Sequence, residues 1–86
     1  MATIFRRVRV ADYARFREVY DAGAAAREAG GIHAEQMFRN PKDTNDILFV
    51  TTVDDIEQAR AYGESDEVRQ RQRAAGLLEL SNYYPE

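Results

Sequence analysis

Hydrophobic and polar positions alternate along four stretches of the chain, and this period of two is typical of β-strands that bury one face. The predicted strands cover residues 3–10, 32–39, 46–53 and 77–84. Between the second and third strands, residues 40–45 belong to types that favour turns, so we expect a β-hairpin with a long loop. Pro85 cannot continue a central strand and ends the last one.

A helix is predicted between the first two strands, over residues 12–29. Asp12 is a suitable N-cap, and Gly30 is a suitable C-terminal stop. One face of this helix recurs at spacings of three and four residues and is rich in aromatic side chains. Its members are Tyr13, Phe16, Tyr20, Ala24 and Arg27.

The second helical segment is predicted in two pieces. Asp55, with Gln58 three residues later, has the form of a capping box and begins the first piece, which Gly63 is expected to end. Ser65 caps the second piece, which stops at Gly76.

The two halves of the chain repeat each other. Three matched pairs lie at one constant offset of 43 residues: Val10 with Val53, Asp12 with Asp55, and Arg17 with Arg60. The stretch from Arg27 to Gly30 also returns, as Arg73 to Gly76, at an offset of 46 residues. Each half therefore follows the order strand, helix, glycine, strand, which indicates a duplicated βαβ unit.

The order βαββαβ, with right-handed crossovers, predicts an α+β fold of the ferredoxin-like type for a single domain over residues 1–86. In this fold, two helices cover one face of a four-stranded antiparallel sheet. The other face is not purely polar, because the third strand carries apolar residues on both sides, including Leu48 and Val50. A chain this short buries only about 60% of its unfolded surface, so pairing would add stability. We predict a homodimer formed through the open sheet face.

Composition narrows the classes of function. The net charge is −3, so no overall positive field favours nucleic acid. The absence of cysteine excludes disulfides and thiolate metal sites, and it fits a reducing compartment. No apolar run approaches the roughly 20 residues that span a bilayer, and the N-terminus lacks the order of a signal peptide. We expect a cytoplasmic protein with no membrane partner.

Three short strings resemble the antibiotic-biosynthesis-monooxygenase-like group of dimeric α/β-barrel proteins: residues 12–17 (Asp-Tyr-Ala-Arg-Phe-Arg), 38–40 (Phe-Arg-Asn) and 53–55 (Val-Asp-Asp). The likeness covers nearly the whole chain. It implies a dimeric α/β barrel made by stacking two sheets, with a ligand cavity between sheet and helices. It also implies a choice of activities: cofactor-free oxygenases acting on polyketide-like phenols, small-molecule isomerases and cyclases, and haem-degrading enzymes. The haem-degrading branch relies on an Asn, Trp and His set and is discounted, because this chain has no tryptophan and one histidine.

Matching Gly30 with Gly76 assigns the faces of the second and fourth strands. The more apolar row is expected to face the helices: Ile32, Ala34, Gln36 and Phe38, with Leu78, Leu80, Asn82 and Tyr84. The alternate row is expected to face a partner or solvent: His33, Glu35, Met37 and Arg39, with Leu77, Glu79, Ser81 and Tyr83. Matching Val10 with Val53 turns six more residues toward the helices: Ile4, Arg6, Val8, Ile47, Phe49 and Thr51.

Arg6, Gln36 and Asn82 then stand out as polar groups on an otherwise apolar surface. Together with Tyr13, Tyr20, Phe38, Phe49 and Tyr62, they predict an aromatic ligand-binding pocket of the kind that holds small molecules. We interpret Arg6 as a candidate catalytic residue that stabilises a phenolate, enolate or carboxylate, with Asn82 placing the substrate. The structural alternative is that Arg6 pairs with a carboxylate while its stem packs on the core, and that the tyrosines are core residues.

His33 is the third candidate catalytic residue, because histidine is the side chain that most often serves as a general acid or base near neutral pH. Its place directly after two glycines, in the row expected to face outward, favours a surface or dimer-contact role. One histidine among scattered carboxylates makes a poor metal site, so no metal is expected.

Taken as a set, these residues favour a homodimer that binds a small apolar or aromatic compound. If it is an enzyme, we expect a monooxygenase, cyclase or isomerase with no bound cofactor. A second class stays open, a non-catalytic binding or assembly module whose own side chains fill the space. A third is a ferredoxin-like nucleic-acid binder, against which the acidic charge and the lack of an aromatic-rich RNA-binding string both count.

Overall fold

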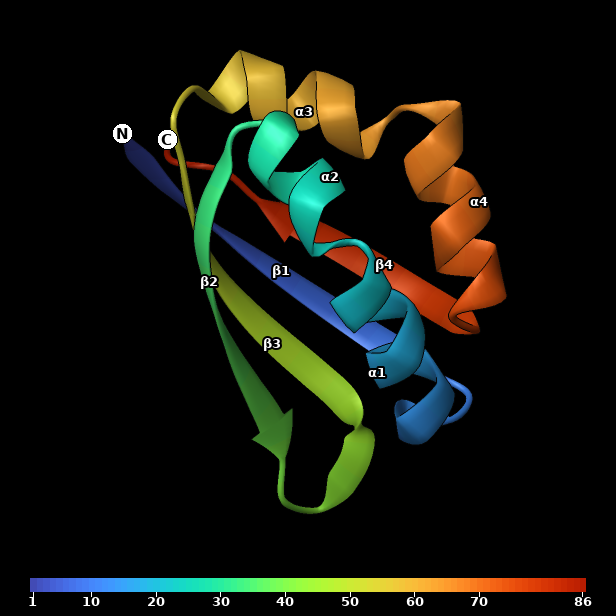
Figure 1. Ribbon diagram of the computed structural model, residues 1–86. Helices are drawn as coiled ribbons and strands as arrows, with labels where there is room; N and C mark the ends of the chain where they lie inside the picture. Colours follow the sequence, from blue (N-terminus) through green and yellow to red (C-terminus); the bar gives the residue numbers. More distant parts are fainter.

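The computed structural model describes all 86 residues and has a single four-stranded sheet with helices on one side (Figure 1). In chain order, the elements are β1 (Ala2–Val10), α1 (Tyr13–Ala22), α2 (Ala24–Ala29), β2 (Ile32–Asn40), β3 (Asp43–Val53), α3 (Ile56–Gly63), α4 (Asp66–Ala74) and β4 (Leu77–Tyr83). The strands are antiparallel in the order β2-β3-β1-β4. The predicted ferredoxin-like α+β fold is confirmed. None of the helices has the length and apolar character needed to cross a membrane.

The prediction of one continuous helix over residues 12–29 is wrong, because the helix is broken at Gly23. This residue caps the end of α1 and the start of α2. Its N–H donates to the Tyr20 carbonyl, three residues earlier, at 3.1 Å, and this hydrogen bond closes a turn tighter than that of an α-helix. Glycine is among the weakest helix formers, so the break falls where helix propensity is lowest. The break lets the chain turn above the sheet between α1 and α2 (Figure 1).

The long hairpin loop expected over residues 40–45 is also wrong. β3 begins at Asp43, so only Pro41 and Lys42 separate it from β2. The Asn40 side chain accepts a hydrogen bond from the Lys42 N–H at 2.9 Å, and the Asp43 side chain accepts one from the Asn45 N–H at 3.2 Å. These residues favour turns because they bond to the nearby backbone, and here the bonds close a short turn.

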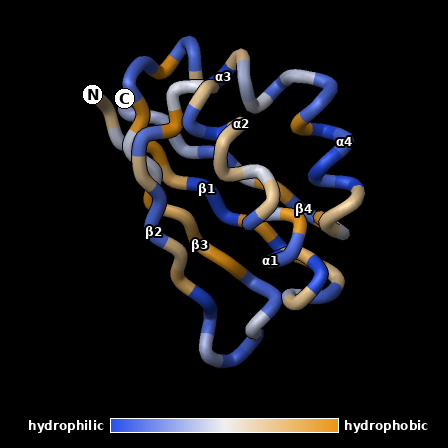
Figure 2. Tube along the Cα trace, viewed as in Figure 1, coloured by the Kyte–Doolittle hydropathy of each residue, from blue (hydrophilic) through white to orange (hydrophobic).

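The core lies between the helices and the two central strands, β1 and β3. Val8, Ile47 and Phe49 pack against Phe16 of α1, and a second cluster around Ile4 and Val53 packs against Ala59 of α3. Figure 2 shows hydrophobic residues along the central strands and a largely hydrophilic α4. The helix-facing positions predicted in the first and third strands are confirmed, since five of the six residues in this row are buried and the sixth, Arg6, is paired with the buried Phe49.

β2 contains an extra residue that reverses its predicted faces. Ile32 pairs with Val53, but the next pair is Ala34 with Thr52, so His33 has no partner and forms a β-bulge. From there on, the residues opposite the buried row of β3, and therefore facing the helices, are Glu35, Met37 and Arg39. The residues that face the open side are Ala34, Gln36 and Phe38. The expectation for these six residues is therefore corrected, while Ile32 is buried as predicted.

The same bulge occurs at the start of β4. Leu77 pairs with Val10 and packs on the core, Glu79 pairs with Arg9, and Leu78 is left over. The expected positions of Leu77 and Leu78 are therefore exchanged, but beyond the bulge the inward row is as predicted: Leu80, Asn82 and Tyr84. Each bulge follows a glycine with positive φ, 86° at Gly31 and 75° at Gly76. The two halves thus correspond from Gly31 to Gly76, one residue away from the match drawn on sequence.

Candidate functional site

A cavity of about 80 Å³ lies between the helix-facing side of the sheet and the helices. Most of its lining is apolar or aromatic: Val8, Phe16, Val19, Tyr20, Phe49, Tyr62, Val68, Ala75 and Leu77. The remaining lining residues are Gly23, Gln72 and three arginines, Arg6, Arg27 and Arg71. No carboxylate belongs to the wall, so the charged part of the lining is entirely positive.

Three aromatic rings form one wall of the cavity. Phe16 and Tyr20, one helical turn apart on α1, have ring centroids 5.7 Å apart. Phe49 on β3 lies 6.1 Å from the Phe16 ring and 5.6 Å from the Tyr20 ring. These separations are typical of favourable aromatic pairs, and the cluster presents ring surface to whatever occupies the cavity.

Arg27 reaches back from α2 over the Tyr20 ring. Its guanidinium carbon is 3.7 Å from the ring centroid, and Nη1 donates to the Tyr20 carbonyl at 2.6 Å. Glycine at position 23 leaves room for this contact, because a Cβ there would lie 3.2 Å from the same Nη1. The cation is therefore held by a π-face and by a backbone carbonyl at once.

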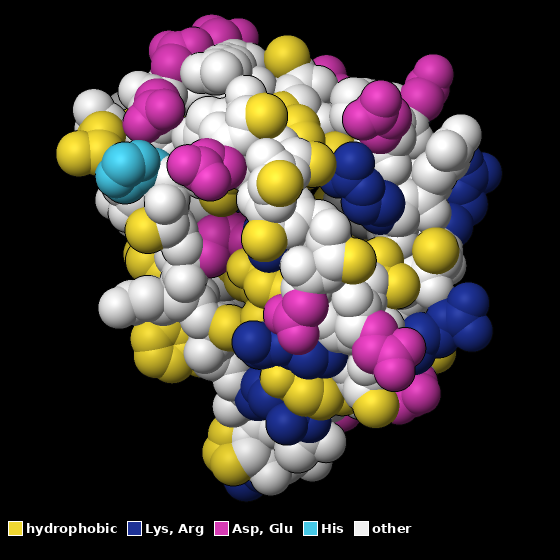
Figure 3. All heavy atoms as spheres, in the orientation of Figure 1, with side chains coloured by type: hydrophobic (Ala, Val, Ile, Leu, Met, Phe, Trp, Pro, Cys, Tyr) yellow, Lys and Arg dark blue, Asp and Glu magenta, His cyan; other side chains and the backbone are white.

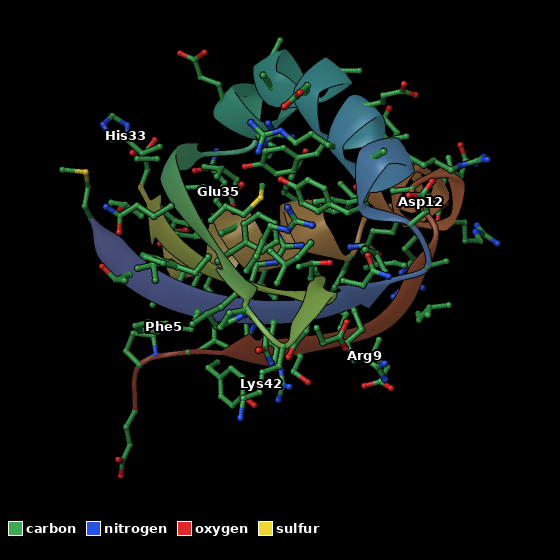
Figure 4. The ribbon with its side chains drawn as sticks, turned by 90° about the horizontal axis from the view of Figure 1, so that it is seen from below. Phe5, Arg9, Asp12, His33, Glu35 and Lys42 are labelled. Carbon is green, nitrogen blue, oxygen red and sulfur yellow. The ribbon has the colours of Figure 1, made fainter.

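Glu35 supplies the only negative charge beside these groups. Its side chain is 4% exposed, and Figure 4 shows it on the helix side of the sheet, opposite Phe5. The Tyr20 hydroxyl donates to Oε1 at 2.6 Å, and the Thr51 hydroxyl donates to Oε2 at 2.8 Å. Arg27 Nε lies 3.6 Å from Oε1. A buried carboxylate needs such partners, because its desolvation is costly otherwise.

The Tyr20 phenol is held in its protonated form. Burial and the hydrogen bond to the Glu35 carboxylate both raise the pKa of Tyr20 far above its ordinary value of 10.0. The nearby cations Arg27 and Arg6 lower the pKa but do not outweigh these two effects. Tyr20 is therefore a fixed donor to Glu35 and not a base at neutral pH.

Arg6 comes from the central strand β1, with a side chain that is 24% exposed. Its Nη1 lies 3.7 Å from Oε2 of Glu35, and its guanidinium carbon is 5.7 Å from the centroid of Phe49. These contacts hold the cation near the aromatic wall and leave its N–H groups free to meet a ligand. On the far wall, Arg71 of α4 donates to the Tyr62 hydroxyl at 3.2 Å.

No protein-family profile matches the sequence, and no curated protein is similar to it in sequence. Solved structures are similar in fold. An antibiotic biosynthesis monooxygenase aligns with a TM-score of 0.73 at 12% identity, over 100% of this chain and 97% of its own. SnoaB, a cofactor-independent oxygenase from Streptomyces nogalater, aligns with a TM-score of 0.73 at 18% identity, over 99% of this chain and 92% of its own. The fold is shared with antibiotic biosynthesis monooxygenases.

Within this antibiotic-biosynthesis-monooxygenase-like fold, four of the predicted site residues line the cavity together: Arg6, Tyr20, Phe49 and Tyr62. Tyr13 lies outside the lining, where its hydroxyl contacts the Met37 sulfur at 3.8 Å. Asn82 pairs with Arg6 across β1 and β4 but is exposed on the edge strand. It is next to the site and not in its wall.

The structure does not bring the other three predicted residues to the cavity. Gln36 and Phe38 lie on the open face of the sheet as a consequence of the β2 bulge. The His33 side chain is 61% exposed at the outer end of β2, where Nδ1 lies 3.7 Å from Asp54 Oδ1 (Figure 4). His33 therefore lies on the surface, as its place in the sequence favoured.

Sequence reasoning missed Arg27, Glu35, Arg71 and Gln72. Arg27 had a detectable signal, because it is the one charged member of an aromatic helix face. Glu35 was placed outside by regular alternation, and only the bulge at His33 brings it in. Arg71 and Gln72 lie in a helix with polar residues on most sides, so periodicity could not separate them from the solvated face.

A second group of basic side chains gathers at the foot of α1, beside the β2–β3 hairpin (Figure 3). Arg39 stacks over the Tyr13 ring with 3.4 Å between the guanidinium carbon and the centroid. Arg17 contacts the Met37 sulfur at 3.6 Å and pairs with Asp21 at 3.0 Å. Both arginines already have partners within the chain, so this surface is a poorer candidate for a ligand site than the cavity.

Proposed function

We propose that this chain binds a small aromatic or enolisable compound in the cavity between the sheet and the helices. The observation that carries the proposal is the combination of an aromatic wall, Phe16, Tyr20 and Phe49, with the available guanidinium of Arg6. A mostly apolar wall with a few oriented polar groups is the usual composition of a small-molecule site.

The volume of the cavity restricts the ligand. At about 80 Å³, it lies well below the roughly 300–1,000 Å³ of sites that hold drug-sized compounds. A single-ring compound fits this space better than a polycyclic one. A larger ligand would require α1 and α2 to move away from α4. The junction between α1 and α2 at Gly23 is a position at which α2 could pivot.

A cofactor-independent oxygenase is the activity best supported, ahead of a cyclase or an isomerase. All three reactions pass through a phenolate or enolate, and a guanidinium held beside the ring stabilises that charge as it develops. An electron-rich phenolate can itself reduce dioxygen, so this branch requires no bound cofactor. SnoaB, which shares the fold, is a cofactor-independent oxygenase.

We also propose that the active form is a homodimer. Apolar side chains form a continuous row across the open face of the sheet: Phe38, Leu48, Val50, Phe5 and Tyr83. Four of these five side chains are exposed to solvent in the single chain. The core is small, because only 15 of the 86 residues are buried. An apolar patch beside so small a core favours association with a second copy.

A binding titration tests the ligand proposal. Resorcinol, a single-ring phenol, is titrated into the 15N-labelled protein and into Arg6→Gln, and dioxygen uptake is followed in parallel. We expect shifts of the amides around the cavity, and an affinity about tenfold weaker in Arg6→Gln because a hydrogen bond to a charged group is lost. Arg69→Gln, on the exposed surface of α4, is the matched control. Equal binding by Arg6→Gln and the wild type would contradict the role of Arg6.

A filled, non-catalytic module is the second candidate. It is favoured by the mutual packing of the Phe16, Tyr20 and Phe49 rings and by the small volume of the cavity beside them. No amide shift with any single-ring phenol, together with an intact dimer, would support this function over the oxygenase.

A further inference from the structure

The charged side chains in and beside the cavity are unequal in number and at least partly buried. Arg6 and Arg27 are only 24% and 17% exposed, and the single carboxylate beside them, Glu35, is 4% exposed. Two cations and one anion leave one positive charge without a counter-charge. A partly buried charge of this kind is costly, and a ligand of opposite charge reduces that cost.

Glu35 neutralises charge without occupying the arginines as hydrogen-bond partners. Its two oxygens are taken by the hydroxyls of Tyr20 and Thr51, at 2.6 and 2.8 Å. The arginine nitrogens stay at 3.6 and 3.7 Å from these oxygens, beyond hydrogen-bonding distance. The carboxylate is therefore fixed in place by neutral donors and acts on Arg6 and Arg27 through its field.

Arg71, the third cation of the wall, has its own counter-charge. Glu67, one turn earlier on α4, lies 3.6 Å from Arg71 Nη2, and the Arg71 side chain is 34% exposed. Its other contact is the neutral Tyr62 hydroxyl. Arg71 therefore does not change the balance of charge around Arg6 and Arg27.

We infer that Glu35 is a specificity-determining residue that sets the charge of the ligand, so that the site selects aromatic compounds with one negative charge. This inference rests on the proposed function, because it assumes that the cavity is a ligand site. A neutral ligand leaves the excess positive charge in place, and a dianion replaces it with an excess negative charge. A monocarboxylate or a monoenolate balances the group.

The test compares three ligands of similar framework: benzoate, benzamide and phthalate, titrated by NMR at neutral pH. The wild type should bind benzoate about tenfold more tightly than benzamide. In Glu35→Gln, the affinity for benzoate should rise about tenfold and that for phthalate about a hundredfold, with benzamide unchanged, because each ligand charge loses one repulsion. Glu18→Gln, on the exposed surface of α1, is the matched control and should leave all three affinities unchanged.

A second variant changes the balance in the opposite direction. Arg27→Gln leaves Arg6 and Glu35 with a summed charge of zero, so the affinity for benzoate should fall to that for benzamide. If Glu35 were only structural, Glu35→Gln would weaken all three ligands alike, and that result would overturn the inference. Equal binding of benzoate and benzamide by the wild type would overturn the inference and leave the aromatic site intact. No binding of either compound would contradict the proposed function as well.

Discussion

Arg7 holds Asp46 with two parallel hydrogen bonds on the open side of the sheet, Nε to Oδ1 at 2.9 Å and Nη2 to Oδ2 at 2.7 Å. Asn40 adds a third donor to the same carboxylate at 3.2 Å. These bonds lower the pKa of Asp46 from 3.8 to about 2, with the bond from Arg7 the largest cause. A two-point arginine–carboxylate pair of this kind fixes the geometry of both side chains.

The depressed pKa of Asp46 predicts a specific acid sensitivity. The folded state favours the charged carboxylate, so its contribution to stability is fully present above pH 4 and is lost as the pH falls toward 2. Urea unfolding of the wild type and of Asp46→Asn should show a difference in unfolding free energy that shrinks between pH 4 and pH 2. A difference that stays constant over this range would contradict the assignment.

The raised pKa of Tyr20 predicts the converse behaviour in alkali. The folded state keeps the proton, whereas the unfolded chain loses it near the ordinary value of 10.0, so stability falls as the pH rises above 10. Tyr20→Phe should remove part of that loss, seen as a flatter dependence of the unfolding free energy between pH 9 and pH 11. Tyr83→Phe, on the exposed edge strand, is the control and should leave the dependence unchanged.

Thr51→Val should destabilise the protein although it conserves shape. The Thr51 side chain is fully buried, and its hydroxyl donates to the Glu35 carboxylate, so valine leaves a buried charge with one donor fewer. We expect a loss of about 1.5–3 kcal/mol in the free energy of unfolding. Thr52→Val, on the opposite side of β3 and less buried, should change stability by less than about 0.5 kcal/mol.

Replacement by alanine should change the stability of the protein in opposite directions at Gly30 and at Gly63. A Cβ at Gly30 would overlap the Tyr62 ring, so Gly30→Ala forces the backbone and the ring apart at a cost of about 1–3 kcal/mol. A Cβ at Gly63 meets nothing within 4 Å, so Gly63→Ala should stabilise the protein by about 0.4–1 kcal/mol through helix propensity. Thermal unfolding distinguishes the two, and equal melting temperatures would contradict the close contact at Gly30.

The proposed dimer predicts that a charge on the open face yields a monomer. Phe38 is 52% exposed within the apolar row, and Phe38→Glu would place a carboxylate in the interface. Leu78 is 63% exposed but belongs to the bulge of the edge strand beside α4, so Leu78→Glu is the matched control. Sedimentation analysis should give a dimer for the wild type and for Leu78→Glu, and a monomer for Phe38→Glu. A monomeric wild type would end the proposal.

The sequence predicted the inward direction of Arg6 because β1 and β3 pair without a register shift over this row, and it predicted the sheet topology from the order of the elements. It failed where one residue changes the geometry. At Gly23, helix periodicity continues through the break, so the spacing placed Arg27 on the same face as Tyr20 but did not indicate that its side chain turns back over the Tyr20 ring. At His33, regular alternation was assumed across a bulge, which placed Glu35 on the wrong side. The missing information was local backbone conformation, which hydrophobic pattern does not encode.

The bulges at His33 and Leu78 also mark positions where a strand can lose one residue and keep the direction of the side chains beyond it. Deletion of the His33 codon would join Ile32 to Ala34 in unbroken alternation and would leave Glu35 beside the arginines. The same deletion at Gln36 would turn Met37 outward and carry Phe38 toward the helices. Two equally small deletions in one strand therefore have different consequences: the first keeps the two faces of β2 as they are, and the second reverses them beyond Glu35.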